Sequence, residues 1–272
     1  MNKISLLFYD NPIARAYTAE LILNNQHIDN VIFIVKPEFK YFPYWYSSYL
    51  TYLRNNYYAI NFLKNKKILD LRKSIVKALN LNEFFYNEMF SFKNIKKISK
   101  NKIRYVVSEN LNDKNIYNVI KGIDSNYIIF SGGGILKTKM LKIKKKFIHI
   151  HPGYLPDIRG ADATLWSILK NNEYASTSFI LDNKIDAGKI IYQKKIDFFN
   201  INKDYIKDLS YTEIYRLIYS FIDPLIRSKI LIKTINNIKE NKELIDNDIS
   251  KGNYYSFMNN EDKEKVFKKI FK

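Results

Sequence analysis

The sequence predicts an α/β protein with a doubly wound, mostly parallel twisted sheet and a helical C-terminal segment. Over the first 200 residues, short apolar runs rich in Ile, Val, Phe and Tyr alternate with segments of helical pattern. That alternation is typical of parallel strands joined by crossover helices. Beyond about residue 200 the helical pattern continues without such runs. We therefore expect one main domain over residues 1–200 and a helical segment over residues 201–272.

The first elements are a strand, a helix and a second strand. Ile4–Tyr9 is an apolar run, and Asn11-Pro12 opens a helix that extends to about Asn24, because Asn caps helices and Pro suits their first turn. Val31–Val35 is the second strand. Later strands are expected at further β-branched and aromatic runs, namely Arg104–Val107, Tyr127–Phe130, Phe147–His151, Ser176–Leu181 and Ile190–Lys195.

Helices are expected between and after these strands. Asp113 can cap a helix over Asp113–Lys121, and Gly122 can end it. Ala163–Leu169 is a further helix, Pro224 lies within or at the start of another, and the last helix is expected near residues 261–271. Residues 37–66 are crowded with Tyr, Phe and Trp. We interpret them as an inserted helix packed on the core, with a substrate wall or a membrane-surface helix as alternatives.

The composition narrows the class of protein. The chain has no cysteine, which excludes disulfides and thiolate metal sites. No apolar run is long enough to span a bilayer, and the first ten residues have too short an apolar core for a signal peptide. We therefore expect a cytoplasmic protein without a membrane partner. The formal charge is +18, but the cations are mostly lysines spread along the chain, which favours a solvated surface over a nucleic-acid partner.

Two of the three histidines, His149 and His151, lie where the strand Phe147–His151 meets a Pro/Gly turn. Alternate residues of a strand point to the same face, so both imidazoles are expected to project together. Open α/β sheets place their sites at strand ends, and histidine is well suited to proton transfer near neutral pH. We predict that the pair takes part in catalysis. One structural histidine beside a chance neighbour is the alternative.

Two glycine-containing loops accompany the histidines. Gly132–Gly134 follows the strand Tyr127–Phe130, and glycines let backbone N–H groups approach a ligand. A plain tight turn is the alternative for this loop. Asp186-Ala-Gly188 forms a turn between two strands, where small residues allow the Asp186 carboxylate to sit on a tight loop near the strand ends. Taken alone, Asp186 would be interpreted as an ordinary surface aspartate.

From Tyr127 to Lys195 the sequence resembles the 10-formyltetrahydrofolate-dependent formyltransferases, which include methionyl-tRNA, glycinamide ribonucleotide and sugar-nucleotide enzymes. The family pattern is Asn-x-His-Pro-Ser-Leu-Leu-Pro, then Arg-Gly, a Trp in a helix and Asp-x-Gly. The spacing from the histidine to the aspartate also fits, and the matching residues are His151-Pro152, Leu155-Pro156, Arg159-Gly160, Trp166 and Asp186-Ala-Gly188. The resemblance implies a Rossmann-like formyltransferase core, with residues 1–200 as the catalytic domain.

The resemblance also implies roles for individual residues. His151 is then the acid/base group, and Asp186 orients it or relays protons through water. The implied formyl donor is 10-formyltetrahydrofolate, with no metal. By position, two loops hold its pteridine, and they correspond to Gly133, Gly134, Ile135 and Leu136 after one strand and to Leu181, Asp182 and Ile185 before Asp186.

Two positions depart from the family pattern: His149 replaces the Asn, and Gly153 replaces the Ser. A histidine can donate a hydrogen bond to an oxyanion, so we expect His149 to be catalytic in place of the Asn. Two nearby imidazolium ions repel each other, and at most one of His149 and His151 is expected to be charged near neutral pH. The substitution can also alter or abolish the activity.

The resemblance favours an N-formyltransferase that acts on a primary amine, with a nucleotide-linked amino sugar as the expected acceptor. The short helical tail differs from the separate β-barrel of the tRNA enzyme, and arginines are few. One alternative is a metal-dependent hydrolase using His149, His151 and either Asp186 or Asp162. Another is a catalytically inactive formyltransferase-like module that binds folate or a nucleotide. The sequence does not fix the oligomeric state, and a homodimer is one of the states it allows.

Overall fold

The computed structural model describes residues 2–9, 11–35, 41–43, 46, 50, 65, 68–83, 97–101, 103–108, 110–131 and 135–272. Most of the aromatic segment 37–66 lies outside these residues, as does the glycine loop with Gly133 and Gly134. The predictions that concern them therefore stay predictions.

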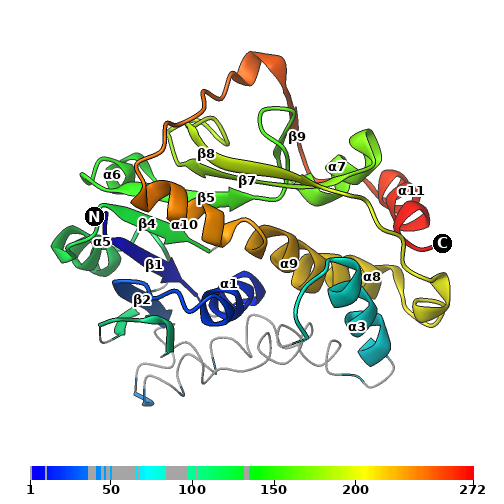
Figure 1. The fold of residues 1–272 in the computed structure, drawn as a ribbon, viewed down its shortest axis with the longest axis horizontal. Helices are drawn as coiled ribbons and strands as arrows, with labels where there is room; N and C mark the ends of the chain where they lie inside the picture. Colours follow the sequence, from blue (N-terminus) through cyan, green and yellow to red (C-terminus); the bar gives the residue numbers. More distant parts are fainter. Residues whose placement is uncertain are drawn as a thin grey trace.

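A seven-stranded sheet forms the centre of the described chain (Figure 1). Its order is β3-β2-β1-β4-β5-β7-β8, with the first five strands parallel and β7 and β8 antiparallel to their neighbours. The predicted doubly wound, mostly parallel sheet is confirmed. The strand bounds are Ile4–Phe8 (β1), Asn30–Val35 (β2), Arg104–Val107 (β3), Tyr127–Phe130 (β4), Lys146–His151 (β5), Tyr174–Ile180 (β7) and Ile190–Ile196 (β8).

The order of the strands reverses between β1 and β4. The chain adds β2 and β3 on one side of β1, and then β4 and β5 on the other side. Crossover connections on either side of such a switch point diverge, which opens a crevice beyond the carboxyl ends of the strands. The carboxyl ends of β1 and β4 border this crevice, and β5, which ends at His151, is the next strand beyond β4.

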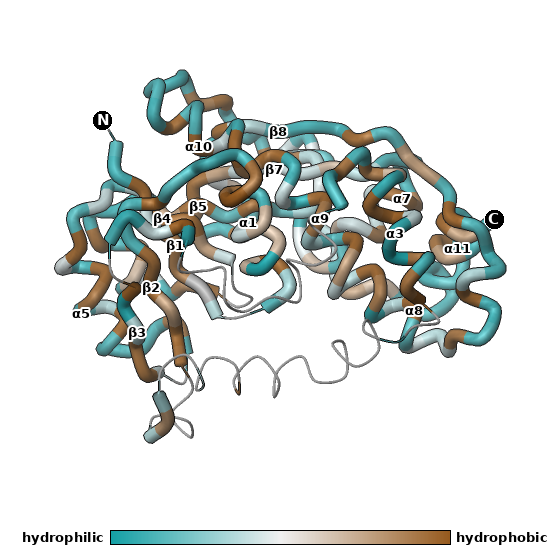
Figure 2. The backbone as a smooth tube through the Cα atoms, turned by 60° about the horizontal axis from the view of Figure 1, so that its bottom comes forward, coloured by the Kyte–Doolittle hydropathy of each residue, from teal (hydrophilic) through white to brown (hydrophobic). Residues whose placement is uncertain are grey.

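Helices cover both faces of the sheet because its inner strands are apolar on both sides. In β2, Val31, Phe33 and Val35 belong to one hydrophobic cluster, and Ile32 and Ile34 belong to another. The first cluster packs against α1 and α10, and the second against α5 and α6. Figure 2 shows hydrophobic residues along β1 and β2. The helices are α1 (Pro12–Leu23), α3 (Leu69–Ala78), α5 (Lys114–Gly122), α6 (Thr138–Leu141), α7 (Ala163–Asn171), α8 (Tyr211–Leu217), α9 (Asp223–Ser228), α10 (Leu231–Lys239) and α11 (Asn260–Ile270).

The predicted helix caps are present. The Asn11 side chain accepts a hydrogen bond from the Ala14 N–H at 2.8 Å, and the Asp113 side chain accepts one from the Asn115 N–H at 2.7 Å. Gly122 is the last residue of α5. These side chains satisfy backbone N–H groups that the first turn of a helix leaves unpaired.

The predicted helical C-terminal segment is present and follows the sheet. The helices α8, α9 and α10 follow one another along the chain (Figure 1). A π-helical turn at Ile218–Ile222 connects α8 to α9, and α9 packs against α1. Beyond α10 the chain also forms the three-residue strand β9 (Asn253–Tyr255), which pairs in parallel with β6 (Ile158–Gly160). The sequence predicted neither strand, because three residues carry no readable periodicity. The domain boundary at residue 200 stays a prediction.

Among the described residues, no helix combines the length and the apolar character that crossing a membrane requires.

Candidate active site

The C-terminal end of β5 carries two histidines on one face, because alternate residues of a strand point to the same side. His149 is half-buried and lies opposite Phe130 of β4, while His151 is only 3% exposed and ends the strand. Asp186 lies in the loop between β7 and β8. The structure therefore brings all three predicted catalytic residues to the carboxyl end of β5.

The contacts of His151 determine which of its nitrogens carries the proton. Its Nε2 lies 2.9 Å from the carbonyl oxygen of Ile158. A carbonyl can only accept a hydrogen bond, so Nε2 must carry the hydrogen and donate it. In the neutral ring, Nδ1 is then an unprotonated base, and it faces the Asp186 carboxylate with an Nδ1–Oδ2 distance of 3.6 Å. A proton taken up at Nδ1 would therefore be stabilised by a nearby negative charge.

The Asp186 carboxylate is held by the backbone of a neighbouring strand. The Gly160 N–H of β6 donates to Oδ2 at 2.8 Å. Asp186 itself has a left-handed backbone with φ of +51°. The Asn247 side chain stabilises this turn by donating to the carbonyl oxygens of Asp186 at 2.9 Å and Gly188 at 3.1 Å. A Cβ at Gly188 would lie 1.7 Å from the Ile180 carbonyl oxygen, so the turn requires glycine there.

Gly153 allows the turn after β5 to pass close to His151. A Cβ at this position would lie 2.9 Å from His151 Nε2 and 2.9 Å from the Ile158 carbonyl oxygen. It would therefore collide with both partners of the hydrogen bond that fixes the ring. Thr177 anchors the turn, since its hydroxyl donates to the Gly153 carbonyl at 2.8 Å and accepts from the Leu155 N–H at 3.1 Å. Glycine at this position therefore leaves room for both the His151 ring and the Ile158 carbonyl oxygen.

His149 meets a different set of partners. Arg227 Nη1 donates to its Nε2 at 3.3 Å, and the ring lies between those of Phe130 and Phe179, with centroids 6.1 and 6.0 Å away. The other ring nitrogen, Nδ1, is buried and makes no well-formed hydrogen bond within the described residues. A buried polar group without a partner costs about 1–3 kcal/mol. The Phe130 backbone, as a weak hydrogen-bond acceptor, raises the pKa of the ring and offsets part of this cost.

Arg227 is the functional residue that the sequence analysis missed. It lies on α9, where the Asp223 carboxylate accepts from its Nε and from Nη2, the latter at 3.2 Å. Its Nη1 also donates to the Ile150 carbonyl oxygen at 2.7 Å. A signal for this pair is present in the sequence. Asp223 and Arg227 are four residues apart within an otherwise apolar helical run, which is a spacing at which helical side chains meet.

Burial keeps both histidines uncharged. The pKa of His149 is lowered well below its usual range by burial first and then by the Arg227 cation, with Asp186 acting in the opposite direction. Burial also lowers the pKa of His151, although the Asp186 carboxylate offsets part of this effect. Both rings are therefore neutral near pH 7, in keeping with the expectation that at most one would be charged.

A pocket of about 140 Å³ opens beside His149 at the ends of β4 and β5. The described residues predicted to hold the pteridine, Ile135, Leu136, Leu181, Asp182 and Ile185, all line this pocket. Ile135 and Ile185 are 72% and 48% exposed, so apolar side chains flank the opening. The full lining is Phe130, Ile135, Leu136, Leu141, His149, Leu181, Asp182, Asn183, Lys184, Ile185 and Asp186.

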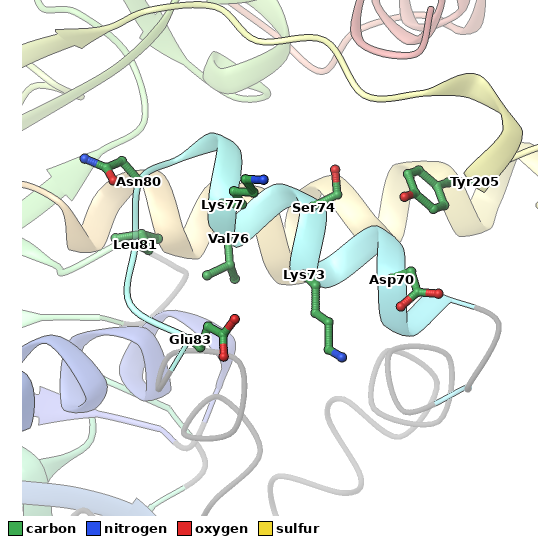
Figure 3. Close-up of a pocket in the computed structure, with 9 residues that line it drawn as sticks. All are labelled: Asp70, Lys73, Ser74, Val76, Lys77, Asn80, Leu81, Glu83 and Tyr205. Atoms are coloured by element: carbon green, nitrogen blue, oxygen red, sulfur yellow. The ribbon is translucent and has the colours of Figure 1, made fainter.

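A larger groove of about 930 Å³ lies along α3, away from the histidines (Figure 3). Its lining includes two lysines, Lys73 and Lys77, and two acidic residues, Asp70 and Glu83. Figure 3 shows Asp70, Lys73 and Lys77 leaving α3 in different directions, with Glu83 on the segment that follows the helix. A reaction centre needs functional groups that converge on one point, and the described residues of this groove include no such set. The smaller pocket is therefore the better candidate.

The alternative of a metal site finds no support in this geometry. The described part of the chain contains no group of three His, Asp or Glu side chains placed to hold a metal ion. The Asp162 carboxylate accepts from the Tyr215 hydroxyl at 3.0 Å, from the Tyr219 hydroxyl and from the Met258 N–H at 2.9 Å, so its oxygens are engaged in the fold. The Arg227 cation next to His149 would also repel a metal cation.

Several known proteins are similar to this chain. Residues 85–210 match the family model described as formyl transferase. Methionyl-tRNA formyltransferase of Campylobacter jejuni strain RM1221 is 26% identical over 122 residues, which cover 44% of this chain and 37% of that protein. The match thus spans little more than a third of the relative's length.

A solved formyltransferase has a similar fold. A sugar N-formyltransferase from Shewanella sp. FDAARGOS_354 aligns over 94% of this chain and 77% of its own, with 15% identity and a TM-score of 0.50. A 4-N formyltransferase from Francisella tularensis aligns over 94% and 76%, with 17% identity and a TM-score of 0.48.

Proposed function

We propose that this chain, whose residues 85–210 match the formyl transferase family model, transfers a formyl group from 10-formyltetrahydrofolate to a primary amine. The observation that carries the proposal is the pairing of the unprotonated Nδ1 of His151 with the Asp186 carboxylate, 3.6 Å apart. A neutral imidazole whose base nitrogen faces a carboxylate is suited to take a proton and to hold it. Formyl transfer to an amine requires that step.

We assign a separate role in the transfer to each of His151, Asp186 and His149. In the transfer, a bond forms between the amine nitrogen and the formyl carbon, and the bond from that carbon to the folate nitrogen breaks. His151 accepts the proton that the amine loses, and Asp186 stabilises the resulting imidazolium. His149 donates from Nδ1 to the formyl oxygen, where negative charge develops. The proton held on His151 can then pass to the folate nitrogen, directly or through water.

The pocket beside His149 fits the planar end of the formyl donor. Apolar side chains, Leu136 and Leu181 among them, make up much of its lining, and the His149 ring lines it as well. Planar heteroaromatic ligands bind in such apolar pockets that offer a small number of polar groups. Ile135, Leu136, Leu181, Asp182 and Ile185 would hold the pteridine, together with the predicted backbone of Gly133 and Gly134.

We propose a nucleotide-linked amino sugar as the acceptor. The Shewanella sugar N-formyltransferase has a fold similar to that of this chain over most of its length, which makes such sugars the first acceptors to test. The tRNA formyltransferase match, by contrast, covers 37% of that protein.

The test is turnover of purified full-length protein with 10-formyltetrahydrofolate and a panel of amino-sugar nucleotides, read as the mass of the acceptor. We expect one acceptor to gain one formyl group, and Asp186→Asn to abolish the gain. Asp124→Asn is the matched control, because Asp124 is an exposed carboxylate paired with Lys3. Folate binding without turnover on any amine would contradict the enzyme proposal and favour a binding module.

A further inference from the structure

We propose that Arg227 is a positioning residue that holds neutral His149 in the tautomer with its hydrogen on Nδ1. The consequence is an N–H donor presented at the pocket, although the sequence has no Asn at this position. The catalytic consequence rests on the proposed function. The assignment of the tautomer does not, because it follows from contacts within the chain.

Arg227 contacts one particular nitrogen of the His149 ring, Nε2. Arg227 Nη1 lies 3.3 Å from His149 Nε2. A guanidinium has five N–H donors and no acceptor, and it stays protonated in proteins. Nε2 can therefore form this hydrogen bond only as the acceptor. A neutral imidazole with an unprotonated Nε2 must carry its hydrogen on Nδ1.

Arg227 is held in a fixed position by buried partners. Its guanidinium is fixed by Asp223 through Nε and Nη2 and by the Ile150 carbonyl oxygen at 2.7 Å from Nη1. Asp223 is 3% exposed and Arg227 is 9% exposed, so the pair is almost fully excluded from solvent. The cation cannot turn away from His149 without breaking buried charged hydrogen bonds, which are the strongest class in a protein interior.

The groups around His149 favour its neutral form. The charged and titratable groups that act on it are Arg227 from α9, His151 from its own strand and Asp186 from the loop after β7. The nearest is a fixed cation, which opposes a second positive charge on the ring. Arg227 thus disfavours imidazolium as well as the Nε2–H tautomer.

The tautomer of His149 determines which nitrogen of this pocket-lining ring can donate a hydrogen bond. Nδ1 of His149 is buried and makes no well-formed hydrogen bond within the described residues, and the ring lines the pocket. A neutral amide N–H, as the family Asn supplies, and a neutral imidazole N–H are equivalent donors to a developing oxyanion. A histidine at this position would lose that equivalence if its hydrogen moved to Nε2. Arg227 prevents the move.

The direct test is ¹⁵N NMR of the imidazole nitrogens in full-length protein labelled at histidine. The chain has three histidines, and His149→Asn identifies the signals of position 149 by their loss. We expect a protonated Nδ1 and an unprotonated Nε2 on His149, without titration between pH 5 and 8. A proton on Nε2, or a titrating ring in this range, would overturn the inference whatever the activity of the protein.

Two double variants remove the hydrogen bond from Arg227 to His149, one with polar and one with apolar replacements. Asp223→Asn with Arg227→Gln removes both charges and also withdraws the donor from His149 Nε2, because the Gln amide nitrogen lies two bonds short of the position of Arg227 Nη1, so Nε2–H should appear. Asp223→Leu with Arg227→Met removes the donor and fills the space with apolar groups, which buried ion pairs often tolerate. In this variant too we expect Nε2–H to appear. An unchanged tautomer would mean that Arg227 does not set it. If the apolar variant fails to fold, the parent spectrum and Asp223→Asn with Arg227→Gln still decide.

The catalytic consequence has its own readout in a double-mutant cycle. With His149 present, the apolar pair should lower turnover about tenfold or more, as expected for partial loss of an oxyanion donor. In the His149→Asn background it should lower turnover less than about threefold, because Asn needs no tautomer control. Equal losses in both backgrounds would assign Arg227 a purely structural role. A parent protein without turnover but with the expected NMR signature would refute the proposed function and leave the tautomer assignment intact.

Discussion

His149 and His151 lie two residues apart on one face of β5, yet the fold gives them opposite partners. His151 donates from Nε2 to the Ile158 carbonyl, and its Nδ1 faces the Asp186 carboxylate. His149 accepts at Nε2 from Arg227, and its Nδ1 has no well-formed hydrogen bond in the described structure. The same ring atom is therefore a base in one residue and a donor in the other.

The spacing His149-x-His151 alone therefore does not determine the chemistry of either histidine. Each ring is neutral, and its tautomer is determined by one partner that contacts Nε2. For His151 that partner is a carbonyl seven residues ahead, and for His149 it is a guanidinium 78 residues ahead. Changes that affect one ring should leave the other largely unaffected.

The largest effect is expected on the His151 side. Replacing His151 with Ala, or Asp186 with Asn, should lower turnover by about 100- to 10,000-fold, because each change removes the proton acceptor or the charge that stabilises it. Steady-state kinetics with the formyl donor and the active acceptor would measure this loss. Asp124→Asn serves as the exposed control. Near-normal turnover of either variant would exclude that residue from the proton transfer.

On the His149 side the expected loss is smaller and depends on the replacement. His149→Ala removes the donor and should lower turnover by about 100- to 1,000-fold, as for other lost oxyanion donors. His149→Asn should retain much of the activity, because Asn supplies a neutral N–H of similar reach. If Ala and Asn behave alike, the donor role is wrong. If only the Asn variant is active, the parent is a degenerate formyltransferase.

Local signals in the sequence predicted most of the fold. Asn11 and Asp113 cap their helices as expected, because capping depends on residues within one turn. The central strands were found because their apolar runs are short and β-branched. The strands β6 and β9 were missed, since their pairing joins segments about 95 residues apart and each has three residues.

The site was predictable only where the chain is contiguous or resembles a known pattern. His149, His151 and Asp186 come together at the end of β5, and the described pocket residues line one cavity. Arg227 was missed because α9 reaches His149 only through the packing of α9 against α1 and β7. No periodicity within β5 reports that contact. The chemistry of His149 could therefore not be derived from the strand that carries it.

Gly153 offers a way to perturb His151 without touching His149. A Cβ here would lie 2.9 Å from both His151 Nε2 and the Ile158 carbonyl oxygen, so Gly153→Ala must displace the ring or the backbone. We expect a loss of about 1–3 kcal/mol in the free energy of unfolding, the usual cost of overpacking. Urea denaturation would measure it, with Gly122→Ala as control, because a Cβ at Gly122 has no neighbour within 4 Å. Equal stability of the two variants would contradict the close packing around His151.

The smallest effect is a change in how stability depends on pH. Burial lowers the pKa of both His149 and His151 in the folded state, so below their usual value of about 6.5 the unfolded chain takes up protons that the folded chain does not. Stability therefore falls as pH falls, by up to about 1.4 kcal/mol per pH unit for each ring. Burial raises the pKa of Glu20 to about 7, and this group opposes one histidine, since between about pH 4.5 and 7 its folded form keeps a proton that the unfolded chain releases.

The direction of the net slope between pH 6 and 5 depends on the balance between the histidines and Glu20. His149→Asn should remove the contribution of one histidine and so reduce the loss of stability on acidification, and Glu20→Gln should make that loss steeper. Urea unfolding at pH 5, 5.5, 6 and 7 would give these slopes. His27→Asn is the control variant, because it also removes a histidine but lies outside the candidate site. A slope that His149→Asn does not alter would mean that His149 is protonated in the folded protein, and the contrast between the two rings would then be wrong.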